Sequence, residues 1–241
     1  MFRHWKLTFT FLFIFSFIIE GLLFYSSSSR QASAQKPTPD QFENEEEALA
    51  EKKVITADNL SAMISYLGEV KVTVEQFNDL TVSNKASMLE EIKTYESFLT
   101  AQKDIADNET SLDAMKTLDS EILTYWNNVY VRAFYWNGEL MQSKVERMYQ
   151  QFENIINNLD TEIKMASKQS SSASQSLYLV REKLKVLSDK KSQSQNKFAE
   201  ISDKSTASVI FTQGKQYVRE AKVLCSELKN ELLDTIYYIE N

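Results

Sequence analysis

Proline and glycine are nearly absent from most of this chain. From Asp40 to Asn241 there is no proline, and the glycines are Gly68, Gly138 and Gly214. Proline inside a helix removes a backbone hydrogen bond and clashes with the preceding turn, and glycine costs about 1 kcal/mol relative to alanine. The shortage of both favours long, uninterrupted helices. We therefore predict an all-α fold, an elongated helical bundle of four to five long helices with coiled-coil segments.

Apolar residues recur at spacings of three and four, which places them on one face of a helix. This pattern predicts a first helix over residues 58–81 and a second over 86–106, with a turn at 82–85 between them. Thr110, followed by Asp113 three residues later, resembles a capping box with aspartate in place of glutamate. We therefore expect the third helix to begin there.

The third helix is predicted to be the longest and to run to about residue 165. Asn137 and Gly138 lie in its middle and indicate either a kink or a turn. Because no other turn residue accompanies them, we favour one helix. At ~1.5 Å per residue, about 55 residues would extend for about 80 Å. The best interruption in the domain follows at Ser170–Ser174.

A heptad pattern begins at Leu177 and continues to Ile201, with the polar residues Lys191 and Ser194 at two core positions. Such a repeat is typical of a coiled coil. The pattern loses phase at residues 202–208, which are either a hairpin turn or a stutter within one long helix. A last helix is predicted to run from there to the end of the chain.

The first 34 residues have the pattern of an export signal. A basic start precedes the apolar stretch 7–25, which Glu20 interrupts, and the small-residue triplet Ala32-Ser33-Ala34 follows. The length of 7–19 is typical of a cleaved signal, whereas 7–25 just reaches the length of a membrane anchor. Cleavage after Ala34 and retention as a signal-anchor both stay open. In either case the basic start stays in the cytoplasm and the remainder crosses the membrane.

Three parts of the chain are therefore expected. Residues 1–34 are the signal peptide or signal-anchor, and residues 35–55 are a linker that contains both prolines and an acidic cluster. This linker has little to bury, so we expect it to be disordered. Residues 56–241 are expected to form the helical bundle domain.

Histidine occurs once, at His4, inside the leader. The exported part then lacks the residue that Ser-His-Asp and Cys-His catalysis and histidine-ligated metals need. No glycine-rich phosphate loop or calcium-loop spacing is present, and we interpret the pair Glu90-Glu91 as a solvated helix face. We therefore expect a protein that is not an enzyme, with no catalytic, cofactor-binding or metal-binding residue.

Cys225 is the only cysteine, so the chain has no intrachain disulfide and no four-cysteine zinc site. It falls in an apolar helical stripe, where a free cysteine acts as a small buried hydrophobe. The alternative is an intermolecular disulfide across a helical dimer, which an oxidising compartment would permit.

The chain is acidic. It carries 27 Lys and Arg against 34 Asp and Glu, of which three basic and one acidic residue lie in the first 34 positions. The remainder therefore holds 24 basic and 33 acidic residues, a net charge of about −9. A domain of this charge without a basic stripe is a poor candidate for binding nucleic acid or anionic lipid headgroups. We expect no nucleic acid partner, and membrane contact only through an uncleaved N-terminal segment.

Aromatic residues cluster in the middle of the third predicted helix, and helical angles spread them over too wide an arc for one buried face. Arg132 lies among them, positioned to stack on a ring. The cluster is interpreted as a thickened bundle core, with a partly exposed recognition patch and a membrane-interface belt as alternatives. The residues of this candidate interaction or ligand patch are Tyr125, Trp126, Tyr130, Arg132, Phe134, Tyr135 and Trp136.

These features predict an extracytoplasmic protein that acts through protein–protein contact, as an envelope scaffold, an adhesin-like protein or a secreted interaction protein. Self-association through the coiled coil is one form of such contact. The chain is secreted or periplasmic if cleaved after Ala34, and otherwise a single-pass membrane protein with its N-terminus in the cytoplasm. One alternative is a sensory or carrier bundle that binds a small ligand at residues 125–136. Another is a membrane-active helical toxin, which the short apolar runs after the leader disfavour.

Overall fold

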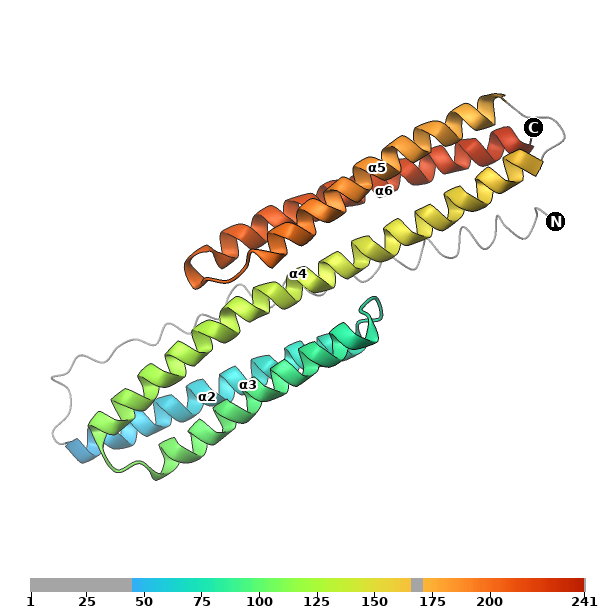
Figure 1. The fold of residues 1–241 in the computed structure, drawn as a ribbon. Helices are drawn as coiled ribbons and strands as arrows, with labels where there is room; N and C mark the ends of the chain where they lie inside the picture. The colour runs from blue at the N-terminus through green and yellow to red at the C-terminus, as the bar shows by residue number, and fades with distance from the viewer. Residues whose placement is uncertain (1–44, 166–170, 241) are drawn as a thin grey trace. The chain divides into compact units, whose positions relative to one another are not determined.

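The computed structural model describes residues 45–165 and 171–240. In these two ranges the chain forms five α-helices and no strand (Figure 1): α2 (Glu45–Gln76), α3 (Val82–Asn108), α4 (Leu112–Met165), α5 (Ser171–Ala199) and α6 (Lys204–Glu240). The prediction of an all-α chain is confirmed for this part, and the predicted signal or anchor lies outside it. No helix in these ranges is both long enough and apolar enough to cross a membrane.

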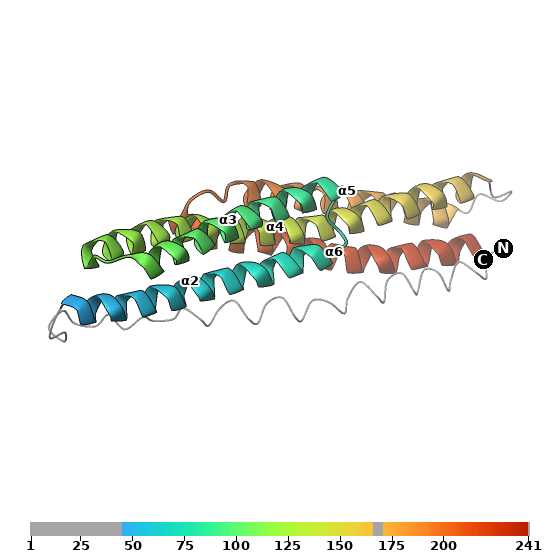
Figure 2. The same cartoon turned by 90° about the horizontal axis from the view of Figure 1, so that it is seen from below.

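Helix α4 is shared by two three-helix bundles. The hairpin of α2 and α3 packs along its N-terminal half, where Trp126 meets Tyr66 of α2 and Tyr125 meets Phe98 of α3. The hairpin of α5 and α6 packs along its C-terminal half. Each hairpin lies beside its own half of α4 (Figure 1, Figure 2). We call α2, α3 and the first half of α4 the first bundle, and the second half of α4 with α5 and α6 the second bundle.

The prediction that α4 is one helix is confirmed. It runs without a break for 54 residues through Asn137 and Gly138. At ~1.5 Å per residue its length is about 80 Å. Gly138 is buried rather than a turn residue, and its place in the second core explains why a glycine stands there.

Helix α2 begins at Glu45, earlier than the predicted Asp58, so residues 45–55 are helical where a linker was predicted. Contacts with other helices hold this segment. Thr56 is 2% exposed and donates a hydrogen bond to Asp119 of α4 at 2.6 Å, and Lys52 pairs with the same carboxylate. Lys53 donates to the backbone carbonyl of Asp107 at 3.0 Å. The acidic first turn also complements the partial positive charge of a helix N-terminus.

The turn between α2 and α3 lies at residues 77–81, before the predicted 82–85. Thr81 is the N-cap of α3, and its hydroxyl accepts a hydrogen bond from the backbone N–H of Asn84 at 3.1 Å. At the end of α2, Lys85 donates to the carbonyl of Glu75 at 2.9 Å, which satisfies a terminal carbonyl. The apolar residues of the turn continue the three-and-four spacing of the helix, so the sequence pattern did not reveal the break.

Helix α4 begins one residue later than the predicted cap. The hydroxyl of Ser111, not of Thr110, faces the backbone N–H of Ala114 at 3.4 Å. The carboxylate of Glu109 accepts from the N–H groups of Thr110 and Ser111 at 2.8 and 3.0 Å. The predicted capping box is therefore replaced by a serine cap and a glutamate that closes the turn.

The predicted break at Ser170–Ser174 is wrong for residues 171–174, because α5 is helical from Ser171, and residue 170 lies outside the described ranges. Of the two alternatives for residues 202–208, the hairpin turn holds, but it spans 200–203, and Lys204 to Ser208 are helical. Asp203 begins α6 by accepting the backbone N–H of Ser205 at 2.8 Å.

Each bundle has its own apolar core. Leu60, Leu67, Ile92, Leu99 and Met115 are fully buried in the first bundle. In the second bundle the fully buried residues come from the predicted heptad positions of α5, from the apolar stripe of α6 and from the second half of α4. They include Phe152, Val180, Leu187, Phe198, Ala221, Leu228 and Leu232. Burying a side chain of this size contributes roughly 1.5–3 kcal/mol, so the two cores hold the helices together without a disulfide.

Candidate functional site

The predicted aromatic patch lies in α4 where the two hairpins adjoin, and its members point at three different helices. Tyr125 stacks on Phe98 of α3 with ring centroids 3.6 Å apart. Trp126 meets Tyr66 of α2 edge-on at 5.7 Å. Phe134 meets Phe211 of α6 at 5.2 Å. The wide arc of aromatic residues is therefore the result of packing against both hairpins at one level of α4.

Most of this patch contributes to the bundle cores rather than to an open surface. Trp136 is 1% exposed, and Tyr125, Trp126, Phe134 and Tyr135 are half-buried. Tyr130 is the most open member at 38% exposed, and its ring packs on Phe134 at 5.0 Å. Ring pairs of this kind add about 0.5–1.5 kcal/mol beyond the burial itself. The sequence thus predicted correctly that the aromatic residues lie in one helix. In the structure most of them pack against other helices.

A polar contact joins the patch to α3. The carboxylate of Glu91 accepts hydrogen bonds from Nη2 of Arg132 at 2.7 Å and from Nε1 of Trp136 at 2.9 Å. Nε of Arg132 also lies 2.6 Å from the second carboxylate oxygen. The guanidinium group lies over the ring of Tyr135, 4.3 Å from its centroid. Arg132 is thus held by a charge-assisted pair and a cation–π contact, which fixes its orientation.

Two neighbouring groups in this region have shifted pKa values. Burial raises the pKa of Tyr135, and the nearby carboxylate of Glu139 raises it further. Burial likewise raises the pKa of Glu139, although its hydrogen bond with Tyr135 and the charge of Arg132 act in the opposite direction. Burial is the main cause of both raised pKa values, and the charge of Arg132 opposes both shifts.

Sequence reasoning missed Glu91, which it treated as part of a solvated pair. Glu90 is indeed exposed, whereas Glu91 bonds Arg132 and Trp136. The signal was in the helical register, because Glu91 lies four residues before Tyr95 and seven before Phe98, on the face that meets α4.

The two polar core positions of α5 form a layer with α4. Ser194 is fully buried and donates to the side-chain carbonyl of Gln142, whose amide donates to the backbone carbonyl of Lys191 at 3.2 Å. Lys191 reaches out of the core to Glu146 at 2.9 Å and lies over the ring of Tyr149. Each polar group in the layer therefore has a partner, which makes the layer compatible with burial and with one register of α5 against α4.

Cys225 lies in α6 at 3% exposed. Burial raises the pKa of its thiol to about 12, so the reactive thiolate is disfavoured. A disulfide between two copies of the chain would require this side chain to leave the core. The position matches the interpretation of Cys225 as a small buried hydrophobe.

A surface that sequence reasoning did not single out lies at the end of the second bundle. The hydrogen bond between Ser176 and Thr235 at 2.7 Å and the ion pair between Arg181 and Asp160 at 3.1 Å bring the end of α4, the start of α5 and the end of α6 together. Large apolar side chains are exposed on all three. We call them the distal surface: Met165, Tyr178, Leu179, Leu233, Tyr237 and Tyr238.

In the part of the chain that the structure describes, no group of three His, Cys, Asp or Glu side chains is placed to hold a metal ion. No family model, curated protein or solved structure matches the chain.

Proposed function

We propose that this chain is an exported or membrane-tethered helical protein without enzymatic activity, and that it acts by binding another protein through the distal surface. One observation carries the proposal. Six exposed large apolar side chains, three of them tyrosines, lie within the end of α4, the start of α5 and the end of α6. Exposed apolar side chains concentrated at one end of a protein are typical of interaction sites, and tyrosine is enriched among residues that dominate binding energy.

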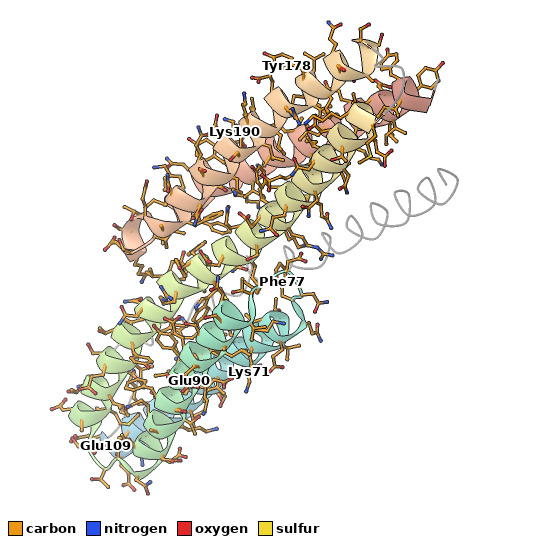
Figure 3. The ribbon with its side chains drawn as sticks, turned by 45° about the vertical axis from the view of Figure 1, so that its right-hand side comes forward. Lys71, Phe77, Glu90, Glu109, Tyr178 and Lys190 are labelled. Atoms are coloured by element: carbon orange, nitrogen blue, oxygen red, sulfur yellow. The ribbon has the colours of Figure 1, made fainter. Side chains whose placement is uncertain are left out.

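The contrast between the two bundles supports this assignment. In the first bundle the exposed large apolar residues are aliphatic apart from Tyr130, and they are spread over three helices, as Val54, Val72, Val82, Ile105 and Leu123 are. Single exposed apolar residues are normal on any protein surface. On the distal surface the exposed fractions reach 77% for Met165 and 61% for Tyr178, and Tyr237 packs against Tyr238 with ring centroids 5.9 Å apart. Figure 3 shows Tyr178 on α5, further from the α5–α6 turn than Lys190.

Site-specific photocrosslinking in cells that make the protein tests the proposal. A photoreactive phenylalanine analogue at Tyr178 should give a discrete adduct with another protein. The matched control carries the same analogue at Leu123, an equally exposed apolar position of the first bundle, and should give no such adduct. A second change, Tyr237→Glu, should reduce the adduct from position 178 at least ~tenfold, since a buried unpaired carboxylate is costly. Equal adducts from positions 178 and 123, or none from 178, would overturn the proposal.

The location of the protein is a separate part of the proposal and has its own test. Determining the N-terminal residue of the chain from fractionated cells distinguishes the two forms of the leader. A chain that starts at Gln35 in a soluble extracytoplasmic fraction is a free interaction protein. A chain that retains Met1 in the membrane fraction is a tethered one. A full-length chain in the cytoplasmic fraction contradicts export.

The small-ligand alternative stays a hypothesis, in which a ligand would enter at the open members of the patch. The open members of the patch are Tyr130 and, in part, Arg132, which is 34% exposed at its side chain. Outside the leader the tryptophans are Trp126 and Trp136, so intrinsic fluorescence reports directly on this region. Saturable quenching by a small molecule, abolished in Tyr130→Ala, would favour the ligand-binding function over the one proposed.

A further inference from the structure

The outward face of α6 carries a second stripe of residues that are spaced by three and four. Spacing of this kind keeps the residues on one face of the helix over about eight turns. All nine members are exposed, whereas the first stripe of α6 is buried in the core of the second bundle. We call the exposed set the outer stripe: Val209, Thr212, Gln216, Arg219, Val223, Ser226, Asn230, Leu233 and Tyr237.

The outer stripe is almost free of charge. Arg219 is its one ionic side chain, and its four large apolar residues are 46–61% exposed. The outward face of α3 differs, because four of its seven exposed residues are charged. Those seven are Ala86, Glu90, Lys93, Ser97, Thr100, Asp104 and Asp107. An exposed helix face normally carries charged side chains, so four large apolar residues with a single charge indicate a contact surface.

The heptad of α5, from which self-association through a coiled coil was predicted, is already used inside the chain. Its apolar positions are buried in the second bundle, where α5 packs on α4 and α6. They include Leu177, Val180, Leu184, Leu187 and Phe198. A second copy of the chain therefore needs a different face, and the outer stripe is exposed along its whole length.

The outer stripe has similar chemistry on the two sides of Val223. The apolar residues Val209 and Tyr237 lie fourteen residues away from it in either direction, and the amides Gln216 and Asn230 lie seven residues away. If two α6 helices lie antiparallel with Val223 facing Val223, apolar residues face apolar ones and amides face amides. A two-fold symmetric interface requires a self-complementary surface of this kind, since residue i contacts j and j contacts i.

The one charge of the outer stripe also has a complement in this arrangement. Arg219 lies near cations of its own helix, because burial lowers the pKa of Lys215 and the charges of Arg219 and Lys222 lower it further. Arg219 stands four residues before Val223, and Glu227 stands four residues after it with 47% of its side chain exposed. Each Arg219 would thus lie level with Glu227 of the second copy, and opposite charges attract. The lysines stand about 100° from their neighbours in the stripe, so they keep their present contacts.

We infer that the outer stripe of α6 binds a second copy of this chain, with the two α6 helices antiparallel and Val223 on the two-fold axis. Burial of the apolar residues drives the association, and the facing amides of Gln216 and Asn230 can donate and accept hydrogen bonds across it. Leu233 and Tyr237 belong to the distal surface as well, so the variants below avoid both positions. The inference does not depend on the proposed function, whose crosslinking position is Tyr178 of α5.

Sedimentation equilibrium of the full-length chain in density-matched non-ionic detergent tests the inference. The wild-type chain should be a dimer at about 50 μM, with a Kd below ~10 μM. Val223→Glu should raise this Kd at least ~tenfold, because it brings two carboxylates together at the two-fold axis. The matched control is Val54→Glu of α2, since the two valines are 60% and 61% exposed. It should change the Kd less than ~twofold, and circular dichroism melting confirms that both variants fold.

Disulfide crosslinking in a Cys225→Ala background tests the antiparallel arrangement. Val223→Cys should form a covalent dimer under mild oxidation. Gln216→Cys and Asn230→Cys should each stay monomeric alone and should crosslink when the two variants are mixed. In the antiparallel pair the two copies of residue 216 lie fourteen residues apart along the helices, or about 21 Å, which is beyond the reach of a disulfide.

Several results would overturn the inference. One is a wild-type chain that is monomeric at the stated concentration, and another is an equal Kd for Val223→Glu and Val54→Glu. A disulfide between two Gln216→Cys chains would indicate a parallel pair and would exclude the antiparallel one. A photoreactive residue at position 223 that links only to a different protein would assign the outer stripe to that protein. None of these results affects the adduct from Tyr178, which tests the distal surface separately.

Discussion

Phe198 is wedged between two glycines that belong to different helices. A Cβ atom on Gly138 of α4 would lie 2.6 Å from Cγ of Phe198, and one on Gly214 of α6 would lie 2.5 Å from Cε1 of the same ring. Phe198 is fully buried, so its ring has no free space to move into. We expect Gly138→Ala to lower the free energy of unfolding by about 1–2 kcal/mol, because overpacking outweighs the better helix propensity of alanine. Urea denaturation followed by circular dichroism measures the change.

Gly68 provides the control for this prediction. A Cβ atom there would meet nothing within 4 Å. Gly68→Ala should therefore raise the free energy of unfolding by up to ~1 kcal/mol, through helix propensity alone. A Gly138→Ala protein as stable as Gly68→Ala would show that the close approach of Phe198 is not a feature of the folded protein.

At this scale the sequence predicts which residues are apolar and helical, but not their partners. The angular spread of residues 125–136 correctly indicated that one buried face is too narrow for them. It did not indicate that Tyr125 meets α3 while Phe134 meets α6, because those contacts join residues far apart in the chain. Glu91 was wrongly interpreted as solvated for the same reason, since its hydrogen bond is with Arg132 of another helix.

Short polar motifs and contacts with distant parts of the chain together determine where a helix begins and ends. The structure ends α2 at Gln76 and begins α3 after Thr81, whereas the apolar pattern alone continues a helix to residue 81. We expect Thr81→Ala to lower the free energy of unfolding by about 1 kcal/mol, because the N–H of Asn84 loses its acceptor. Thr81→Ser should keep most of the stability, and thermal melting compares the two.

Thr100 serves as the reference for the cap. It lies within α3, and its hydroxyl donates only to the carbonyl of Glu96 in the preceding turn. Thr100→Ala should be neutral or slightly stabilising, since alanine has the higher helix propensity. If Thr81→Ala behaves like Thr100→Ala, residue 81 is inside a helix and the turn lies where the sequence alone placed it.

The two flanks of α6 show that the helical register separates charges that the overall composition only counts. A net negative charge led to the expectation that no basic stripe exists, yet the helical period places Lys215, Lys222 and Lys229 on one flank and the glutamates on another. The heptad was readable in the sequence. What was missing was the neighbour of each flank, which only the ion pairs between α5 and α6 reveal.

At the scale of the molecule, α4 is the helix that the two bundles share. The contacts of the two hairpins overlap along its centre, because the first hairpin reaches Arg147 and the second reaches back to Asn127. Arg147 pairs with Asp79 of the α2–α3 turn, and Lys204 at the start of α6 donates to Asn127 at 2.7 Å. Figure 3 shows Phe77 of that turn close to α4, and Lys144 of α4 lies 5.5 Å from the centroid of its ring. An unbroken α4 should therefore make the two bundles unfold together.

Breaking α4 between these contacts should separate the two bundles. Asn137 is exposed and lies between the levels of the two turns. Asn137→Pro removes one helix hydrogen bond and clashes with the preceding turn, at a cost of about 3 kcal/mol or more. Tryptophan fluorescence follows the first bundle through Trp126 and Trp136, while circular dichroism follows all helices. In the wild-type chain the two urea transitions should coincide, as two-state unfolding requires. In Asn137→Pro they should separate, whereas Asn137→Ala should leave them coincident, since it preserves the helix. Separate transitions already in the wild-type chain would mean that α4 joins two independent bundles and transmits no cooperativity between them.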